Sequence, residues 1–219
     1  MHKSSLSSAS KAFAALGNVP FGRHLLMPLL AEYKRPNDKI ARWLASGDLV
    51  PLRKGLYVLG QGWRTAPLSL PLVANVLFGP SYVSLEFALS AHGLIPESVA
   101  VVTSVTTRRG REIDTPLGLF SYTHLPWPLY GVDMRMEKTP DGTSFLMASP
   151  TQAVCDLVVL SKRFHKSGVK AMREFLFEDM RIDPEIIATL NKDIIAQSIA
   201  VGRKSRQLQA LLACVESLS

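Results

Sequence analysis

Residues 35–59, RPNDKIARWLASGDLVPLRKGLYVL, decide how the first part of this chain folds. Pro36, with Asn37 or Asp38 after it, suits the start of a helix, and Gly47 suits its end. At 100° per residue Ile40 and Leu44 share one face of that helix, with Trp43 at the border. The other side carries polar, cationic or small residues, namely Asp38, Lys39, Arg42, Ala45 and Ser46. The stretch therefore predicts an amphipathic helix with a cationic outer face.

Two β-prone runs follow this helix, LVPLR at residues 49–53 and LYVL at residues 56–59. Lys54 and Gly55 connect them as a two-residue turn in which glycine supplies a positive φ. Upstream we expect two more short helices, one from about Ser10 to the Gly17-Asn18 stop and one within residues 23–33. Three helices followed by a hairpin predict a winged helix-turn-helix, whose third helix enters the major groove while the wing lies along phosphates.

Positive charge is concentrated in the same part of the chain. The whole sequence has a formal charge of +7, yet residues 1–60 hold nine Lys or Arg against three Asp or Glu, which leaves +1 for the rest. This distribution is typical of a small nucleic-acid-binding module joined to a nearly neutral domain. The alternative to DNA contact is that the cations of residues 34–42 lie on an ordinary solvated helix face. The expected DNA contacts are Lys34, Arg35, Asn37, Asp38, Lys39, Arg42, Ser46, Arg53 and Lys54.

Two glycines and a proline in residues 59–67 predict a boundary between a DNA-binding domain at residues 1–60 and a second domain at residues 66–219. In the second domain, residues 68–79 and 84–93 predict helices. Strand-like runs at residues 99–107, 112–116 and 117–125 predict a small antiparallel meander, and residues 143–148 predict a further strand. Ser149, Pro150 and Gln152 predict a capped helix start, and residues 162–217 are mostly helical with breaks at Pro184 and Gly202. The predicted fold class is α+β: a winged helix-turn-helix, then a mixed α/β domain with a small antiparallel sheet and a helical C-terminus.

Two groups in the second domain are possible functional surfaces. The cluster of Arg108, Arg109 and Arg111 either extends a nucleic-acid contact or is a solvated hairpin tip. Tyr82, Ser84 and Glu86 either shape a surface or mark a helix entry, with Ser84 as N-cap and Glu86 in the first turn.

Several classes of protein are disfavoured. Cys155 and Cys214 lie far apart in helical patterns and predict buried, reduced thiols in a cytoplasmic protein. No apolar run reaches the ~18 residues that span a bilayer, so no membrane partner is expected. The acid-free first 31 residues superficially resemble a transit peptide, but they run into the helical motif without a linker. No zinc spacing or phosphate-binding glycine loop is present, and the acids of a possible nuclease, Glu112, Asp114, Asp133 and Glu137, lack a following lysine at the required spacing. We therefore expect no enzyme and no cofactor.

The segments YKRPNDKIARWLASGDLVPLRKGLYVL, GPSYVSLEFALSAHGLIPESVAVVTSVTTRRG, TPLGLFSYTHLP and ASPTQAVCDLVVL resemble the AbiEi-type antitoxins of type IV toxin-antitoxin systems, over roughly residues 20–160. The resemblance implies a winged helix that binds inverted repeats in the promoter of its own operon, as cooperating monomers or as a dimer. It also implies a second domain that opposes a nucleotidyltransferase-like toxin, without a stable complex being required. Trp43 departs from the smaller aliphatic residue expected there and either contacts DNA or fills the helix–sheet junction. The alternative function is a stand-alone transcriptional regulator whose second domain oligomerises or senses a ligand.

Overall fold

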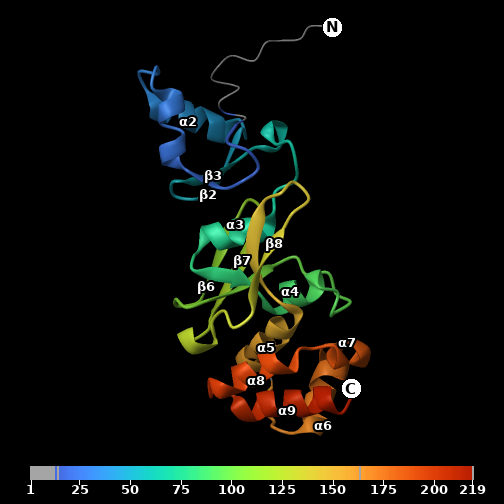
Figure 1. Cartoon of the computed structure of the whole chain (residues 1–219). Helices are drawn as coiled ribbons and strands as arrows, with labels where there is room; N and C mark the ends of the chain where they lie inside the picture. Colours follow the sequence, from blue (N-terminus) through green and yellow to red (C-terminus); the bar gives the residue numbers. More distant parts are fainter. Residues whose placement is uncertain (1–12, 14, 163, 219) are drawn as a thin grey trace, which may run out of the picture.

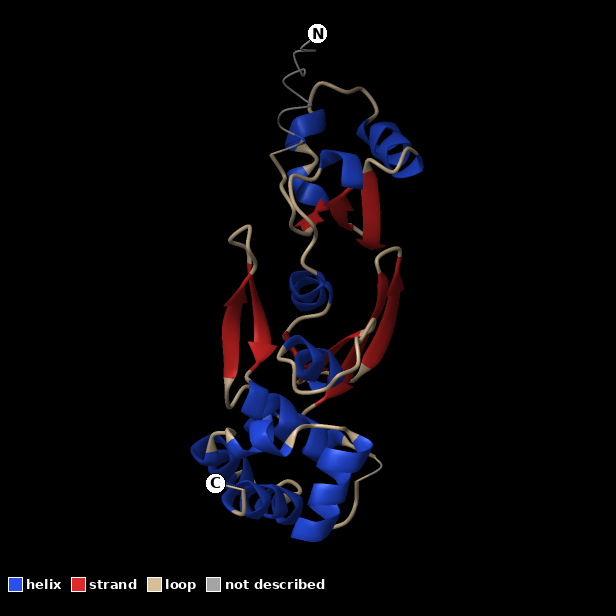
Figure 2. Cartoon of the chain, turned by 90° about the vertical axis from the view of Figure 1, so that its right-hand side faces the viewer, coloured by secondary structure: helices blue, strands red, loops and turns tan. Residues whose placement is uncertain are grey.

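The structure is a computed structural model that describes residue 13, residues 15–162 and residues 164–218. Its elements form three successive parts along one long axis, shown in Figure 1: a small N-terminal unit, a six-stranded sheet with its covering helices, and a helical C-terminal end. Figure 2 shows the strands of the large sheet between the other two parts. The α+β class expected from the sequence is confirmed.

The N-terminal unit combines short helical segments with a three-stranded antiparallel sheet of order β1-β3-β2. Its elements are β1 (Phe21–Gly22), the 3-10 turns η1 (Arg23–Leu25) and η2 (Pro28–Leu30), α2 (Pro36–Ala45), β2 (Leu49–Arg53) and β3 (Leu56–Leu59). The predicted helix before Gly47 and the hairpin around Gly55 are confirmed, and the two glycines have φ values of +75° and +77°. Glycine adopts positive φ without steric cost, which explains why glycine follows the end of α2 and stands in the turn of the hairpin.

Two details of this unit differ from expectation. The short helix predicted within residues 23–33 is present only as two separate 3-10 helices, η1 and η2, and Pro28, which has no N–H to donate, begins the second one. Strand β1 was not predicted, since its two residues are too short to show a period. The first predicted helix, from about Ser10, lies largely outside the described residues.

The hairpin is shared between two hydrophobic cores. One face contributes Leu49 and Leu59 to the core of the N-terminal unit, which also contains Phe13, Phe21, Leu26, Leu30 and Ile40. The remaining buried hairpin residues, Leu52, Leu56 and Val58, belong instead to the large core of the sheet and the C-terminal helices. Burial of both faces fixes the N-terminal unit against the second part of the chain.

The large sheet is mixed, with the order β6-β7-β5-β4-β9-β8. Its strands are β4 (Ser81–Val83), β5 (Val102–Thr106), β6 (Arg111–Thr115), β7 (Gly118–His124), β8 (Met134–Lys138) and β9 (Ser144–Ala148). Two pairs are parallel, β5 with β7 and β4 with β9, and the other three are antiparallel. The predicted small antiparallel meander is therefore wrong. Strand β7, with its buried Phe120 and Tyr122, occupies an interior position, while charged β6 is displaced to the edge.

Helices cover both faces of this sheet. They are α3 (Leu70–Leu77) on one face, and α4 (Leu85–Ala91) and α5 (Pro150–Leu160) on the other. The Tyr122 hydroxyl donates a 2.8 Å hydrogen bond to the carbonyl of Ala74 in α3. The predicted start of α5 is confirmed, because the Ser149 hydroxyl accepts from the Gln152 amide at 3.1 Å. The Gln152 side chain does not turn back to the helix start, because it donates to Asp156, at 2.7 Å.

The C-terminal end is helical, as expected. It contains α6 (Val169–Arg173), a π-helical turn (Glu174–Asp179), α7 (Pro184–Ala188), α8 (Lys192–Ala200) and α9 (Ser205–Glu216). The Lys204 ammonium, between α8 and α9, donates to the carbonyls of Val158, Ser161 and Phe164 at 3.3, 2.8 and 3.1 Å. These bonds hold the helical end against the last turn of α5. Cys155 and Cys214 are buried and free, as predicted.

Candidate nucleic-acid interface

The outer face of α2 carries side chains whose charges are weakly engaged. The Arg42 side chain is exposed, and its Nε donates a long, 3.4 Å hydrogen bond to the carbonyl of Asp38. The Arg35 guanidinium lies 3.8 Å from the Asp38 carboxylate, with 85% and 60% of the two side chains exposed. Such a solvated ion pair contributes ~1 kcal/mol or less. Arg35 and Arg42 are thus available to an anionic partner.

Lys39 lies over two aromatic rings, that of Tyr33 before α2 and that of Trp43 within it. Its ammonium lies 5.0 Å from the ring centroid of Trp43 and 5.9 Å from that of Tyr33, both cation–π distances. Trp43 also stacks on Phe13 with 4.5 Å between ring centroids. This stacking places Trp43 at the junction between the helix and the core of its unit.

Asn37 and Ser46, at the two ends of α2, already have intramolecular partners. The Asn37 carbonyl oxygen accepts a hydrogen bond from Arg23, and the Ser46 hydroxyl donates to the Asp48 carboxylate. Two hydrogen bonds lower the pKa of the Asp48 carboxyl. The larger effect comes from the Ser46 bond, and the next from a 2.7 Å bond that the Trp63 Nε1–H donates. Both predicted contact residues are therefore engaged by neighbouring side chains within the N-terminal unit.

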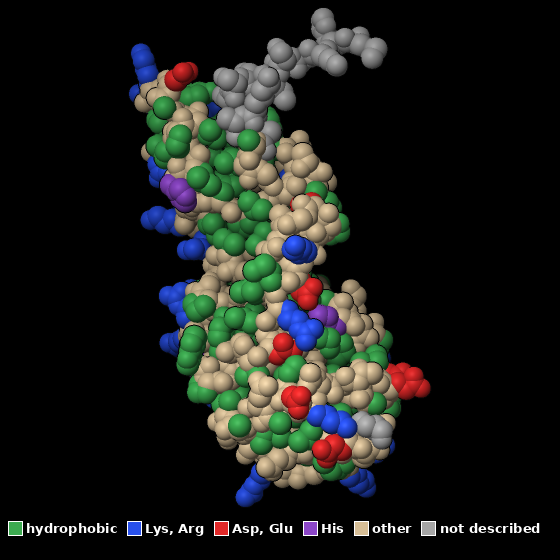
Figure 3. Space-filling model, in the orientation of Figure 1, with side chains coloured by type: hydrophobic (Ala, Val, Ile, Leu, Met, Phe, Trp, Pro, Cys, Tyr) green, Lys and Arg blue, Asp and Glu red, His purple; other side chains and the backbone are tan. Residues whose placement is uncertain are grey.

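The hairpin tip presents Arg53 and Lys54 to solvent. Both side chains are exposed, as is Lys34 before α2, and none of the three forms an ion pair with another described residue. A backbone hydrogen bond holds the tip against the start of η1, because the Gly55 carbonyl accepts from the Arg23 amide at 2.9 Å. Figure 3 shows Lys and Arg side chains projecting along one edge of the N-terminal unit and continuing along the same edge of the sheet domain.

The arginine cluster of the second part is organised by one aromatic ring. Arg108 and Arg111 place their guanidinium carbons 5.1 and 4.7 Å from the centroid of the Phe78 ring. Arg108 also donates a 3.1 Å hydrogen bond to the carbonyl of Gly79. With exposed Arg109 they form no ion pair within the described part of the chain. Because β6, which begins at Arg111, contacts β2 of the hairpin, the cluster lies beside the N-terminal unit.

We use the name basic edge for the exposed or partly exposed cations of these two regions. They are Lys34, Arg35, Lys39, Arg42, Arg53, Lys54, Arg108, Arg109 and Arg111. The sequence identified each of them, but their common edge depends on the contact between β2 and β6, which no local pattern reports.

Tyr82 and Ser84 do not form a surface, which corrects the functional interpretation of this pair. Both side chains are fully buried, and their hydroxyls donate to Oδ2 of Asp156 at 2.9 and 2.6 Å. Ser84 stands at the N-cap position of α4, but its side chain bonds Asp156 and not a helix amide. Burial raises the pKa of the Asp156 carboxyl to about 7. One weak sign of this group is visible in the sequence, where Asp156 is a single acid within the otherwise apolar run of residues 153–160.

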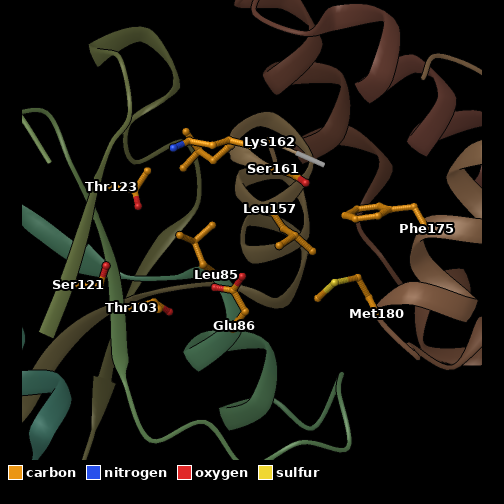
Figure 4. Close-up of a pocket in the computed structure, with 11 residues that line it drawn as sticks. Leu85, Glu86, Thr103, Ser121, Thr123, Leu157, Ser161, Lys162, Phe175 and Met180 are labelled. Carbon is orange, nitrogen blue, oxygen red and sulfur yellow. The ribbon is translucent and has the colours of Figure 1, made fainter. Parts of the chain in front are cut away.

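Glu86 is separated from that network and lines a cavity of about 520 Å³. Figure 4 shows hydroxyl side chains of the sheet on one side of the cavity and apolar side chains of the helical end on the other. Glu86 and Lys162 are its charged lining residues, and neither forms an ion pair with another described residue. Leu85 at its wall has a φ of +58°, a strained value for a leucine. Other lining residues are Thr103, Ser121, Thr123, Leu157, Phe175 and Met180.

Two further properties bear on the site. Within the described ranges no group of three His, Cys, Asp or Glu side chains is arranged to hold a metal ion. No described helix has the length and apolar character needed to cross a bilayer.

The comparisons with known proteins give a fold relationship. No family model matches the chain, and no curated protein matches it. Among solved structures, the chain is similar to the RV2827C protein from Mycobacterium tuberculosis, with a TM-score of 0.52 and 15% sequence identity. The match covers 94% of this chain and 79% of that one. At this level of identity the likeness establishes a shared fold across nearly the whole chain.

Proposed function

We propose that this chain is a promoter-binding regulator and antitoxin of the AbiEi type, with a winged helix-turn-helix as its N-terminal unit. The observation that carries the proposal is the basic edge, where cations from the helix, the hairpin tip and the start of β6 lack strong acidic partners among the described residues. Phosphate contacts by such cations release counterions and dominate the affinity for DNA. A protein that binds promoter DNA in this way works in the cytoplasm.

In this proposal α2 is the reading helix and the β2–β3 hairpin is the wing. Ile40 packs inward, so the opposite face of α2, with Arg42, points away from the core. A guanidinium there can contact phosphate or the O6 and N7 atoms of a guanine. Arg53 and Lys54 then lie along the adjacent backbone, where they add affinity without sequence selection.

A direct test compares Arg42→Ala with Lys170→Ala, which removes one exposed positive charge from α6 at the far end of the molecule. Fluorescence anisotropy with the chain's own upstream duplex should give roughly tenfold weaker binding for Arg42→Ala and unchanged binding for Lys170→Ala. Equal losses for the two variants would show that net charge alone attracts DNA and would refute the assignment of α2.

The antitoxin role rests on the resemblance of residues 20–160 and concerns the second part of the chain. Its expected functional partner is a nucleotidyltransferase-like toxin encoded beside it, opposed without a required stable complex. Co-expression with that toxin should restore growth, and the Arg42→Ala variant should still restore it although it binds DNA roughly tenfold more weakly. Failure of the wild-type chain to restore growth would reject the antitoxin role and leave a DNA-binding regulator.

The cavity beside Glu86 favours a second candidate, a stand-alone regulator that senses a small ligand. Glu86 and Lys162 form no ion pair with any residue that the structure describes, and with a hydroxyl-bearing wall and an apolar wall they suit a small amphipathic molecule. Thermal-shift screening of such molecules, followed by anisotropy with DNA, tests this candidate. A hit that raises the melting temperature of the wild type but not of Glu86→Gln, and changes DNA affinity, would support it over the antitoxin.

A further inference from the structure

The two edges of the large sheet differ in how they are covered. At one edge, β6 contacts β2 of the N-terminal unit. At the other edge, β8 pairs with β9 on its inner side and has no strand beyond it among the described residues. None of the five residues of β8 is buried, and Met136 is 68% exposed. An open edge strand with exposed methionines is a template for pairing with another strand.

The sequence of β8, Met-Arg-Met-Glu-Lys, is complementary to itself when two copies run antiparallel. A two-fold axis at Met136 places Arg135 of each copy opposite Glu137 of the other, which gives two cross-strand pairs of opposite charge. The Met136 side chains then meet at the axis. Arg135 is already held on this face of the strand by Asp133, at 3.1 Å.

We propose that two copies of this chain associate through β8, so that their six-stranded sheets become one continuous sheet across a two-fold axis. The interface is isologous, because each copy offers the same strand in the same register. It goes beyond the proposed function and does not depend on DNA binding. If the chain both associates through β8 and binds DNA, the two-fold axis also relates two N-terminal units, which is the symmetry of an inverted repeat.

Sedimentation velocity of the full chain without DNA, across a range of concentrations, tests this interface. Wild type should form a reversible dimer. Arg135→Glu and Glu137→Arg should each place like charges opposite one another and raise the dimer Kd by roughly tenfold or more. The double variant, with both substitutions, should recover the dimer because the charge pairs are restored in reverse. Lys170→Glu on α6 is the matched surface control and should dimerise as the wild type does.

Either of two results would overturn the proposal: a wild-type chain that stays monomeric at every concentration, or a dimer that both single charge reversals leave intact. Loss of the dimer in both single variants without recovery in the double variant also contradicts the register centred on Met136. Circular dichroism melts of all variants check that folding is unchanged.

Discussion

The Ser84 hydroxyl donates a 2.6 Å hydrogen bond to Oδ2 of Asp156, 72 residues further along the chain. This bond, with those from Tyr82 and Gln152, ties the junction of β4 and α4 to the middle of α5. The Asp156 carboxyl is nevertheless deeply buried, and desolvation raises its pKa to about 7 despite these donors. Oε1 of Gln152 has no hydrogen-bond partner in the part of the chain that the structure describes, and a rotated Gln152 amide would let it accept a proton held on Asp156.

The raised pKa of Asp156 predicts a pH-dependent stability. The folded-state value of about 7 lies above the unfolded value near 3.9, so the folded state keeps the proton between these limits. Its contribution is fully present below pH ~4 and is lost as the pH rises through about 7, a total of about 4 kcal/mol. Urea unfolding from pH 4 to pH 8 should show this decline for the wild type and a flatter profile for Asp156→Asn. Exposed Asp179→Asn is the control, and an equally steep profile for Asp156→Asn would contradict the assignment.

Gly60 is predicted to be essential for closing the hairpin onto the end of α2. An added Cβ there would lie 1.9 Å from the carbonyl oxygen of Gly47, a distance that backbone atoms cannot accommodate. Gly60→Ala should therefore lower the free energy of unfolding by about 3 kcal/mol or more, at or beyond the upper end of the usual range for overpacking. Gly62→Ala, where a Cβ would meet no atom within 4 Å, is the matched control and should change it by less than about 1 kcal/mol. Similar effects of the two substitutions on thermal unfolding would refute the close approach.

Leu52 is predicted to couple the N-terminal unit to the rest of the chain. Its side chain is 4% exposed and lies in the large core, although the residue belongs to the hairpin. We expect the wild type to unfold in one calorimetric transition, and Leu52→Ala should lower the free energy of unfolding by about 2–5 kcal/mol and separate that transition into two. Leu25→Ala, which truncates a leucine that is 45% exposed in the same unit, should leave one transition. A single transition in both variants would show that the hairpin does not couple the two cores.

The wing is predicted to contribute phosphate contacts. Substituting both Arg53 and Lys54 by alanine should reduce the dependence of log K on log salt by about 1.8, at ~0.9 per phosphate contact. The loss should be equal for the upstream duplex and a random duplex, because phosphate contacts carry no sequence information. A loss confined to the upstream duplex would instead place these side chains on base edges.

Single residues that start, turn or end the backbone were enough to predict some elements. Pro36 and Gly47 bound α2, Gly55 turns the hairpin, and Ser149 caps α5, because each of these residues acts through its own backbone or its nearest neighbours. The cations of the proposed interface were identified from their types and positions for the same reason.

Features that depend on distant contacts were missed. The parallel pairs β5–β7 and β4–β9 join segments that are not consecutive, and β4 is only three residues long. Ser84 looked like a helix cap because its true partner, Asp156, is far away in the sequence. Tertiary packing decides such partners, so no local period or capping signal reveals them.

The most direct test of promoter recognition is a competition titration. It compares binding of the wild-type chain to its own upstream duplex and to a random duplex of equal length, at several salt concentrations. We predict binding to the upstream duplex at least ~100-fold tighter than to the random one, with a steep salt dependence for both. Equal, weak binding to the two duplexes would contradict promoter recognition, since the basic edge would then attract DNA without distinguishing its sequence.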